Sequence, residues 1–268
     1  MVSLWRPSTY GEQLFLMLHA FTGQSLKLTH DGDREMAFLA DRAGFESFSR
    51  LIATFEVFER VLSFSKATYR TAPELPPDRF VSELRYEIDL PSAITRQKVF
   101  GEVLKQAGKV VAQKKREYTR EISEQLTADE PPYCYLCGVP FDETIKFARR
   151  TTEHLWPLVY GGQTELQNLV AACADCNEER ASIAMWATGP VHSTHFTPTK
   201  DVKTPPKPVR FALALARIYA TANNNGQGRQ MTLKEAVQRV RPAIPDLDLS
   251  VGRSHVFFEM IHHAGVTL

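Results

Sequence analysis

Apolar residues in the first half of the chain recur at spacings of three and four positions, the period of a helix with one buried face. The pattern runs through FLMLHAF at 15–21, FSRLIATFEVFERVLSF at 48–64 and VFGEVLKQAGKVVAQKKREYTREISEQL at 99–126. The sequence therefore predicts an α-helical N-terminal region over residues 1–126.

Prolines indicate where these helices end. They fall in TAPELPPDRF at 71–80 and in DLPSAITR at 89–96. After the second interruption, Ser92 or Thr95 is a suitable N-cap. We expect one long helix from there to about Leu126.

The pattern changes beyond Leu126. Residues 127–190 combine turn residues, short extended runs and all four cysteines, which predicts a separate small module. Residues 191–268 begin in a proline-rich stretch without apolar periodicity, typical of a linker or an extended strap. Amphipathic patterns then predict a helical C-terminal region, with helices at 209–222, 232–244 and 254–265. The predicted fold class is mainly α with a small α+β module.

Composition excludes some functions. The chain has 268 residues, 43% of them hydrophobic, and a net charge of +1. Any attraction to a polyanion must therefore come from a local cluster of cations. No apolar run approaches the roughly 20 residues that span a bilayer, and MVSLWRPSTYGEQLFLML at 1–18 lacks the order of a secretory signal. We expect a cytoplasmic protein with no membrane partner.

The cysteines form two CxxC pairs, CYLC at 134–137 and CADC at 173–176. Two such turns complete a closed tetrahedral shell of four thiolates, which is typical of structural Zn²⁺. Because a closed shell leaves no open coordination position, this ion is expected to fold the module rather than to react. The ligands would be Cys134, Cys137, Cys173 and Cys176.

A second group of polar residues lies between the knuckles. TTEHLWP at 151–157 predicts a strand that carries Glu153 and His154, and NLVAA at 168–172 predicts its return strand. A helix is then expected from about Asp175 through NEERASIAMWA, with Asn177 in its first turn. A carboxylate, an amide oxygen and waters suit Mg²⁺, and an adjacent imidazole is suited to take a proton from an attacking water.

The order of these pieces resembles the HNH, or ββα-metal, endonucleases in their four-cysteine zinc variant. The shared pattern is CxxC, the EHLWP strand, a Gly-Gly turn, Asn-Leu, and CxxC followed by Asn. The resemblance implies that His154 is the general base and that Glu153 and Asn177 hold Mg²⁺ or another divalent ion. It also implies that Asn168 holds the loop and orients His154.

Two positions depart from the family pattern. Glu153 stands where Asp is common, which places the ion further out or weakens the ligand. Arg180 stands where Lys is usual and keeps a cation for phosphate. Arg149 and Arg150, just before the strand, are further candidate contacts with substrate. His192 and His195 are kept as a remote second possibility for the catalytic histidine.

Basic residues also cluster between Lys105 and Arg120. They are Lys105, Lys109, Lys114, Lys115, Arg116 and Arg120, against one acid, Glu117. This stretch is either a solvated helix face or a phosphate-tracking surface that leads into the module.

The resemblance implies a metal-dependent endonuclease that cuts DNA, with one centre that nicks one strand as a monomer. HNH modules with helical flanks are similar to nuclease components of bacterial anti-phage systems, such as Septu and Zorya, and to restriction enzymes. That similarity implies a larger protein partner. Two alternatives stay open: a zinc-stabilised nucleic-acid-binding module with a decayed centre, and an interaction subunit of a larger complex.

Overall fold

The structure is a computed structural model, and it describes residues 4–25, 42–87, 98–113, 117–181, 183–188, 190–223 and 230–266. The fold is mainly helical, with two small two-stranded sheets among these residues. The predicted fold class is confirmed. None of the helices within the described ranges is long and apolar enough to cross a membrane.

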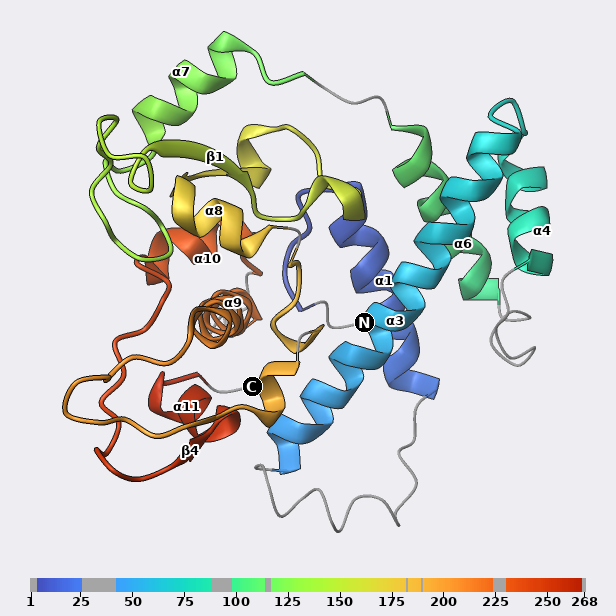
Figure 1. The fold of residues 1–268 in the computed structure, drawn as a ribbon. Helices are drawn as coiled ribbons and strands as arrows, with labels where there is room; N and C mark the ends of the chain where they lie inside the picture. The colour runs from blue at the N-terminus through green and yellow to red at the C-terminus, as the bar shows by residue number, and fades with distance from the viewer. Residues whose placement is uncertain are drawn as a thin grey trace.

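Four helices make up the described N-terminal region, as Figure 1 shows. They are α1 (Tyr10–Ser25), α3 (Arg42–Thr71), α4 (Pro77–Glu87) and α6 (Lys98–Ala112). Helix α6 contacts the other three, and α1 packs on α3. Aromatic rings of α1 and α3 meet in this bundle, with Phe15 5.9 Å from Phe58 in edge-to-face contact.

The single long helix expected up to Leu126 is wrong. Helix α6 ends at Ala112, and a second helix, α7 (Arg120–Asp129), begins after the N-cap Thr119, whose Oγ1 accepts a hydrogen bond from the Ile122 amide. The two helices bury their apolar faces in different places: α6 joins the main core, while α7 packs in a small separate cluster with β2. One straight helix could not place its apolar residues in both clusters. The expected caps Ser92 and Thr95 lie outside the described residues.

The middle of the chain forms the expected hairpin and helix. Strand β1 (Arg150–His154) pairs antiparallel with β2 (Leu169–Cys173), so that Glu153 lies opposite Val170 and His154 opposite Leu169. Two short 3₁₀ turns, η1 (Leu158–Tyr160) and η2 (Leu166–Asn168), lie in the connection.

Helix α8 (Ala174–Arg180) follows β2 directly and is shorter than expected. The prediction that it continues through NEERASIAMWA is wrong. Ala181 has φ 45°, which helical backbone does not adopt, so the chain turns away there. The sequence then re-forms only a single turn, η3 (Trp186–Thr188).

The C-terminal region contains the expected helices α9 (Lys207–Asn223), α10 (Leu233–Val240) and α11 (Phe257–His263). The strap before α9 contains η4 (Pro190–Ser193) and a two-residue strand, β3 (His195–Phe196), which pairs with β4 (His255–Val256). A capping box starts α10, in which Thr232 and Glu235 satisfy each other's backbone amides.

One apolar cluster contains residues from all three of the regions that the sequence predicts. Trp156, from the loop after β1, is fully buried and its ring lies 5.5 Å from Phe15 and 5.9 Å from Phe58. Helix α9, seen end-on near the centre of Figure 1, adds buried residues along most of its length. Because the hairpin packs on this shared core, the flanking helices fix its position.

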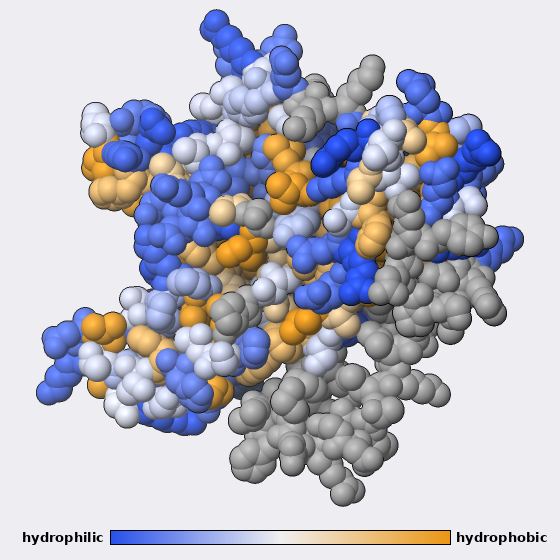
Figure 2. Space-filling model, turned by 45° about the vertical axis from the view of Figure 1, so that its right-hand side comes forward, coloured by the Kyte–Doolittle hydropathy of each residue, from blue (hydrophilic) through white to orange (hydrophobic). Residues whose placement is uncertain are grey.

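The described surface carries polar side chains and some exposed apolar ones. On the face drawn in Figure 2, hydrophilic side chains predominate and apolar residues show as small separate patches. The basic stretch predicted between Lys105 and Arg120 is partly neutralised where it is described, because Lys105 pairs with Glu102 and Arg120 with Glu124. Lys114, Lys115 and Arg116 lie outside the described residues.

Candidate metal centre and active site

The four cysteines converge on one point. Their Sγ atoms all lie within 4.8 Å of one another, and those of Cys137 and Cys173 are 3.8 Å apart. Zn–S bonds of about 2.3 Å in a tetrahedron place sulfurs about 3.8 Å apart. The cluster is therefore positioned to hold a metal ion, and its size fits Zn²⁺.

The first pair sits on a tight turn. The Gly138 amide donates to the Cys134 carbonyl at 2.9 Å, and the Cys134 amide donates to the Val139 carbonyl. Gly138 has φ 75°, a conformation that glycine adopts without a side-chain clash. This turn brings Cys134 and Cys137 onto the same side.

The second pair sits where a strand becomes a helix. Cys173 is the last residue of β2 and the N-cap of α8, while Cys176 lies one turn into α8. An ion held by both pairs would therefore fix the angle between strand and helix.

The thiols are electrostatically coupled. Hydrogen bonds from neighbouring thiols lower the pKa of Cys137 to about 2. Burial raises the pKa of Cys173 to about 12, and a hydrogen bond with Cys134 is the main cause that raises the pKa of Cys176. Four sulfurs this close do not all ionise unless a cation compensates their charge, which is the condition a bound metal supplies.

The residues of β1 contact two sets of neighbours. Thr151 and Glu153 face α8, where they meet Asn177 and Arg180. Thr152 and His154 meet other partners, Tyr118 and Thr164.

Glu153 is buried, with 3% of its surface exposed. Its Oε1 accepts hydrogen bonds from the Tyr135 hydroxyl at 2.9 Å and from the Arg180 guanidinium. Its Oε2 is buried and has no partner among the described residues. One carboxylate oxygen is thus hydrogen-bonded within the protein, and the other is left to accept a further ligand.

Arg180 is fully buried at the end of α8. Besides Glu153, its guanidinium donates to the carbonyls of His154 at 3.0 Å and of Leu155 at 2.6 Å. These donors face the protein rather than solvent. Arg180, expected as a phosphate contact, instead joins α8 to the end of β1 through these hydrogen bonds.

His154 ends β1 and is half-buried. Its Nε2 lies 3.2 Å from the Oγ1 of Thr164, which comes from the connecting loop. Burial lowers the pKa of His154 below its ordinary value of 6.5, so the imidazole is neutral at pH 7. If Nε2 carries the proton and donates to Thr164, Nδ1 keeps a lone pair.

Asn168 closes the connection between the strands. Its Oδ1 accepts from the Trp156 amide at 2.7 Å, and its Nδ2 donates to the carbonyls of Trp156 and Gln163 at 3.0 Å each. The Leu155 amide donates to the Asn168 carbonyl. Asn168 therefore fixes the backbone that follows His154.

Asn177 faces the hairpin from α8. Its Nδ2 donates to Thr151 Oγ1 at 3.1 Å and to the Thr152 carbonyl at 3.3 Å. Its Oδ1 accepts no hydrogen bond from the part of the chain that the structure describes, so this oxygen is available to a cation.

The two arginines before the hairpin differ. Arg149 is exposed. Arg150 is partly buried, donates to the Leu126 carbonyl at 3.1 Å and lies over the Phe141 ring at 5.2 Å. Arg149 faces solvent, while Arg150 links the hairpin to α7.

Sequence reasoning missed Thr164 and Tyr135, which contact His154 and Glu153. Tyr135 lies inside CYLC, but the motif calls for no particular residue there. Thr164 lies in a loop whose path depends on tertiary contacts. No periodicity or motif singles out either residue.

An antiparallel hairpin, a loop closed by an asparagine and a following helix, joined by two cysteine pairs, define a ββα-metal module. Residues 134–182 match the family described as HNH endonuclease. This segment is therefore an HNH endonuclease domain, carried between helical flanks. The chain matches no curated protein and no solved structure.

Zinc content tests the role of the cysteines. We expect Cys134→Ser to lose one equivalent of bound zinc and to lower the melting temperature of the full chain, because the ion is part of the fold. Zinc is measured by mass spectrometry and unfolding by circular dichroism. His154→Ala is the control and should keep both zinc and fold. Full zinc and an unchanged melt in Cys134→Ser would contradict the assignment.

Denaturant unfolding tests the buried ion pair. Arg180→Met leaves Glu153 buried without its counter-charge and should cost about 3–5 kcal/mol of stability. The double variant Arg180→Met, Glu153→Leu should recover most of that loss, since both charges are removed. Exposed Arg149→Gln should change stability by less than about 0.5 kcal/mol. Equal stability of the single and double variants would show that the two side chains are not coupled.

Proposed function

We propose that this protein is a metal-dependent endonuclease that hydrolyses DNA phosphodiester bonds. One observation carries the proposal: within an HNH endonuclease domain, a neutral, half-buried His154 contacts Thr164 at the end of β1, and Asn168 holds the backbone of the loop that follows. A neutral imidazole in a fixed position is what a general base requires.

The chain's own residues perform the proton transfer. His154 takes a proton from water, and the resulting hydroxide attacks phosphorus. The bond from phosphorus to the 3′ oxygen breaks and the leaving oxygen takes a proton from solvent water, so the products are a 5′-phosphate and a 3′-hydroxyl. Thr164 keeps the imidazole oriented, and Asn168 keeps the strand end in place.

A divalent ion such as Mg²⁺ would supply charge neutralisation at the phosphate and at the leaving oxygen. Asn177 fits this role because its Oδ1 is available on the face of α8 toward the hairpin. Glu153 fits through Oε2, the buried carboxylate oxygen that has no hydrogen-bond partner among the residues the structure describes. The other oxygen is held by Tyr135 and Arg180.

One such centre cuts one strand, so the monomer is expected to nick duplex DNA. The helical flanks, which share a core with the domain, would dock a larger protein partner that targets or restrains the nuclease. Anti-phage defence or restriction is the biological setting that we propose for such an assembly.

The hydrogen bonds that Glu153 makes support a second candidate function. Because this carboxylate already has an arginine and a tyrosine partner, the ion site would be weaker than one with a free acid. The protein would then act as a zinc-stabilised nucleic-acid-binding subunit of a complex.

Plasmid cleavage distinguishes the two. With Mg²⁺ or Mn²⁺, zinc-loaded wild-type protein should convert supercoiled plasmid to the open-circular form, and leaving out the added Mg²⁺ or Mn²⁺ should stop the reaction. His154→Ala should cut about 10²–10⁴ times more slowly. His262→Ala, which removes an exposed histidine on α11, is the matched control and should be unaffected.

Two results would count against the proposal. Nicking at the wild-type rate by His154→Ala would show that His154 is not the base. Binding of DNA without cleavage under any divalent ion would favour the second candidate.

A further inference from the structure

A cleft of about 670 Å³ lies beside the hairpin, outside the HNH residues that carry chemistry. Its walls come from α3, from the end of α6 and from the loop that connects β1 to β2. The α3 wall supplies Lys66, Tyr69 and Arg70, and α6 supplies Val110 and Val111. The loop wall runs from Leu158 to Glu165.

The cleft adjoins the candidate active site at one residue. Thr164, one of its lining residues, is the residue whose hydroxyl contacts His154 Nε2 at 3.2 Å. Gly161 and Gly162 form part of the same wall, and a methyl group on Gly161 would stand 2.4 Å from Val110. The loop therefore approaches α6 closely while Thr164 reaches toward the histidine.

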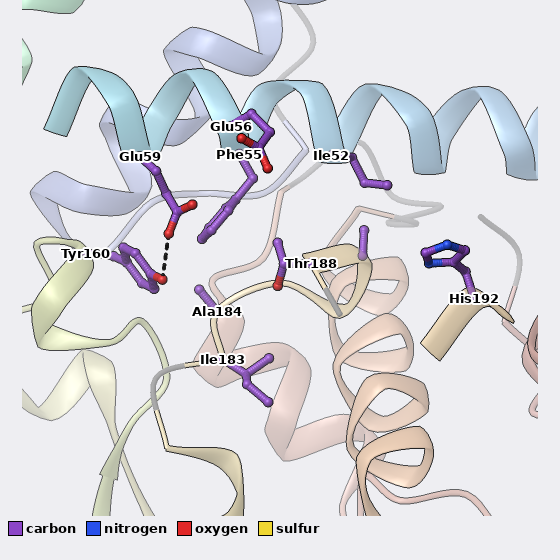
Figure 3. A pocket seen from close by; sticks show the side chains of 10 residues that line it. Ile52, Phe55, Glu56, Glu59, Tyr160, Ile183, Ala184, Thr188 and His192 are labelled. Carbon is purple, nitrogen blue, oxygen red and sulfur yellow. Dashed lines mark hydrogen bonds between the residues drawn. The ribbon is translucent and has the colours of Figure 1, made fainter. Parts of the chain in front are cut away.

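Helix α3 contributes acidic side chains to one cleft and basic side chains to another. The smaller one, shown in Figure 3, has Glu56 and Glu59 on its α3 side, and Tyr160 donates its hydroxyl proton to Glu59. The larger one has Lys66 and Arg70 on its α3 side. Of these two clefts, the larger one includes Thr164, the residue that contacts His154, and it is also the cleft that contains the cations.

The cations differ in availability. Lys66 donates to the Val159 carbonyl at 2.6 Å, which holds its ammonium at the rim of the cleft. Arg70 is exposed, and its guanidinium has no hydrogen-bond or ion-pair partner within the described ranges. Glu165 is the acid in the lining, and it lies on the loop wall.

Resting on the proposed nuclease function, we propose that this cleft binds an unpaired nucleotide of the DNA strand next to the bond that is cut. Arg70 and Lys66 contact its phosphate, while Tyr69 and the valines of α6 contact its base. A cationic rim combined with an aromatic ring is the arrangement that binds single strands.

The size of the cleft sets the class of substrate. Sites for small molecules have volumes of about 300–1,000 Å³, so this cleft takes one or two nucleotides and no duplex. The preferred DNA therefore has a flap, gap or single-stranded segment at the cut. A fully paired duplex lacks the group that fills the cleft.

Binding to single-stranded DNA tests this without cleavage. Fluorescence anisotropy of a labelled oligonucleotide is measured on full-length, zinc-loaded His154→Ala protein without added Mg²⁺ or Mn²⁺, over a series of salt concentrations. Arg70→Gln should weaken binding several-fold and lower the salt slope by about 0.7, the value for one phosphate contact on a single strand. Tyr69→Leu should weaken binding about fivefold or more, because the stacking ring is lost. Tyr69→Phe keeps the ring and should bind as the parent protein does.

Arg79→Gln, an exposed arginine on α4 outside the cleft, is the matched control and should bind as the parent does. Equal losses in Arg70→Gln and Arg79→Gln would overturn the proposal, because the effect would then be one of general charge. Unchanged binding in Arg70→Gln and Tyr69→Leu would also overturn it. So would competition by paired duplex as strong as that by single strand.

This experiment separates the cleft from the reaction. If no variant or ion supports cleavage but the binding losses occur, the proposed nuclease function fails and the cleft stands. If wild-type protein nicks plasmid but the cleft variants bind normally, the nuclease function stands and the cleft proposal fails.

Discussion

The convergence of four thiols is the constraint on which the rest of the domain depends. It lies where β2 becomes α8, so it fixes the angle at which Asn177 and Arg180 meet the hairpin. The first knuckle is also tied into the fold by its backbone: the Tyr135 amide donates to Ala171 on β2, and Ala243 and Ile244 donate to the Tyr135 and Leu136 carbonyls. A metal ion at the thiols would link this knuckle to the hairpin and the helix, and the knuckle's backbone joins them to the C-terminal region.

Glu153 and His154 have different contacts. Glu153 is bound by Tyr135 and Arg180, and this buried pair secures the end of β1. His154, the last residue of the strand, contacts Thr164, which also lines the larger cleft. The carboxylate is therefore held by the protein, while the imidazole lies at the strand end beside the loop. Buried ion pairs are costly to break and seldom stabilise outright, which is consistent with a role in positioning.

The sequence was sufficient for the order of strand, turn, strand and helix, for the cysteine cluster, and for the places of Asn168 in the connection and of Asn177 in the helix that follows. These follow from spacing, because short motifs constrain local geometry. It was insufficient for the break between α6 and α7, since periodicity continues through a stretch whose two halves pack in different clusters. Nor did it show that Arg180 is buried, because that depends on Tyr135 and Glu153, which are distant in sequence.

The central claim is that a structural zinc and a separate catalytic ion occupy one hairpin–helix unit. Anomalous diffraction from crystals of His154→Ala protein soaked in Mn²⁺ tests it most directly. We expect an anomalous peak at the zinc edge among the sulfurs of Cys134, Cys137, Cys173 and Cys176. A distinct anomalous peak from manganese should lie beside Asn177 Oδ1. A single peak at the cysteines, with none at Asn177, would contradict it.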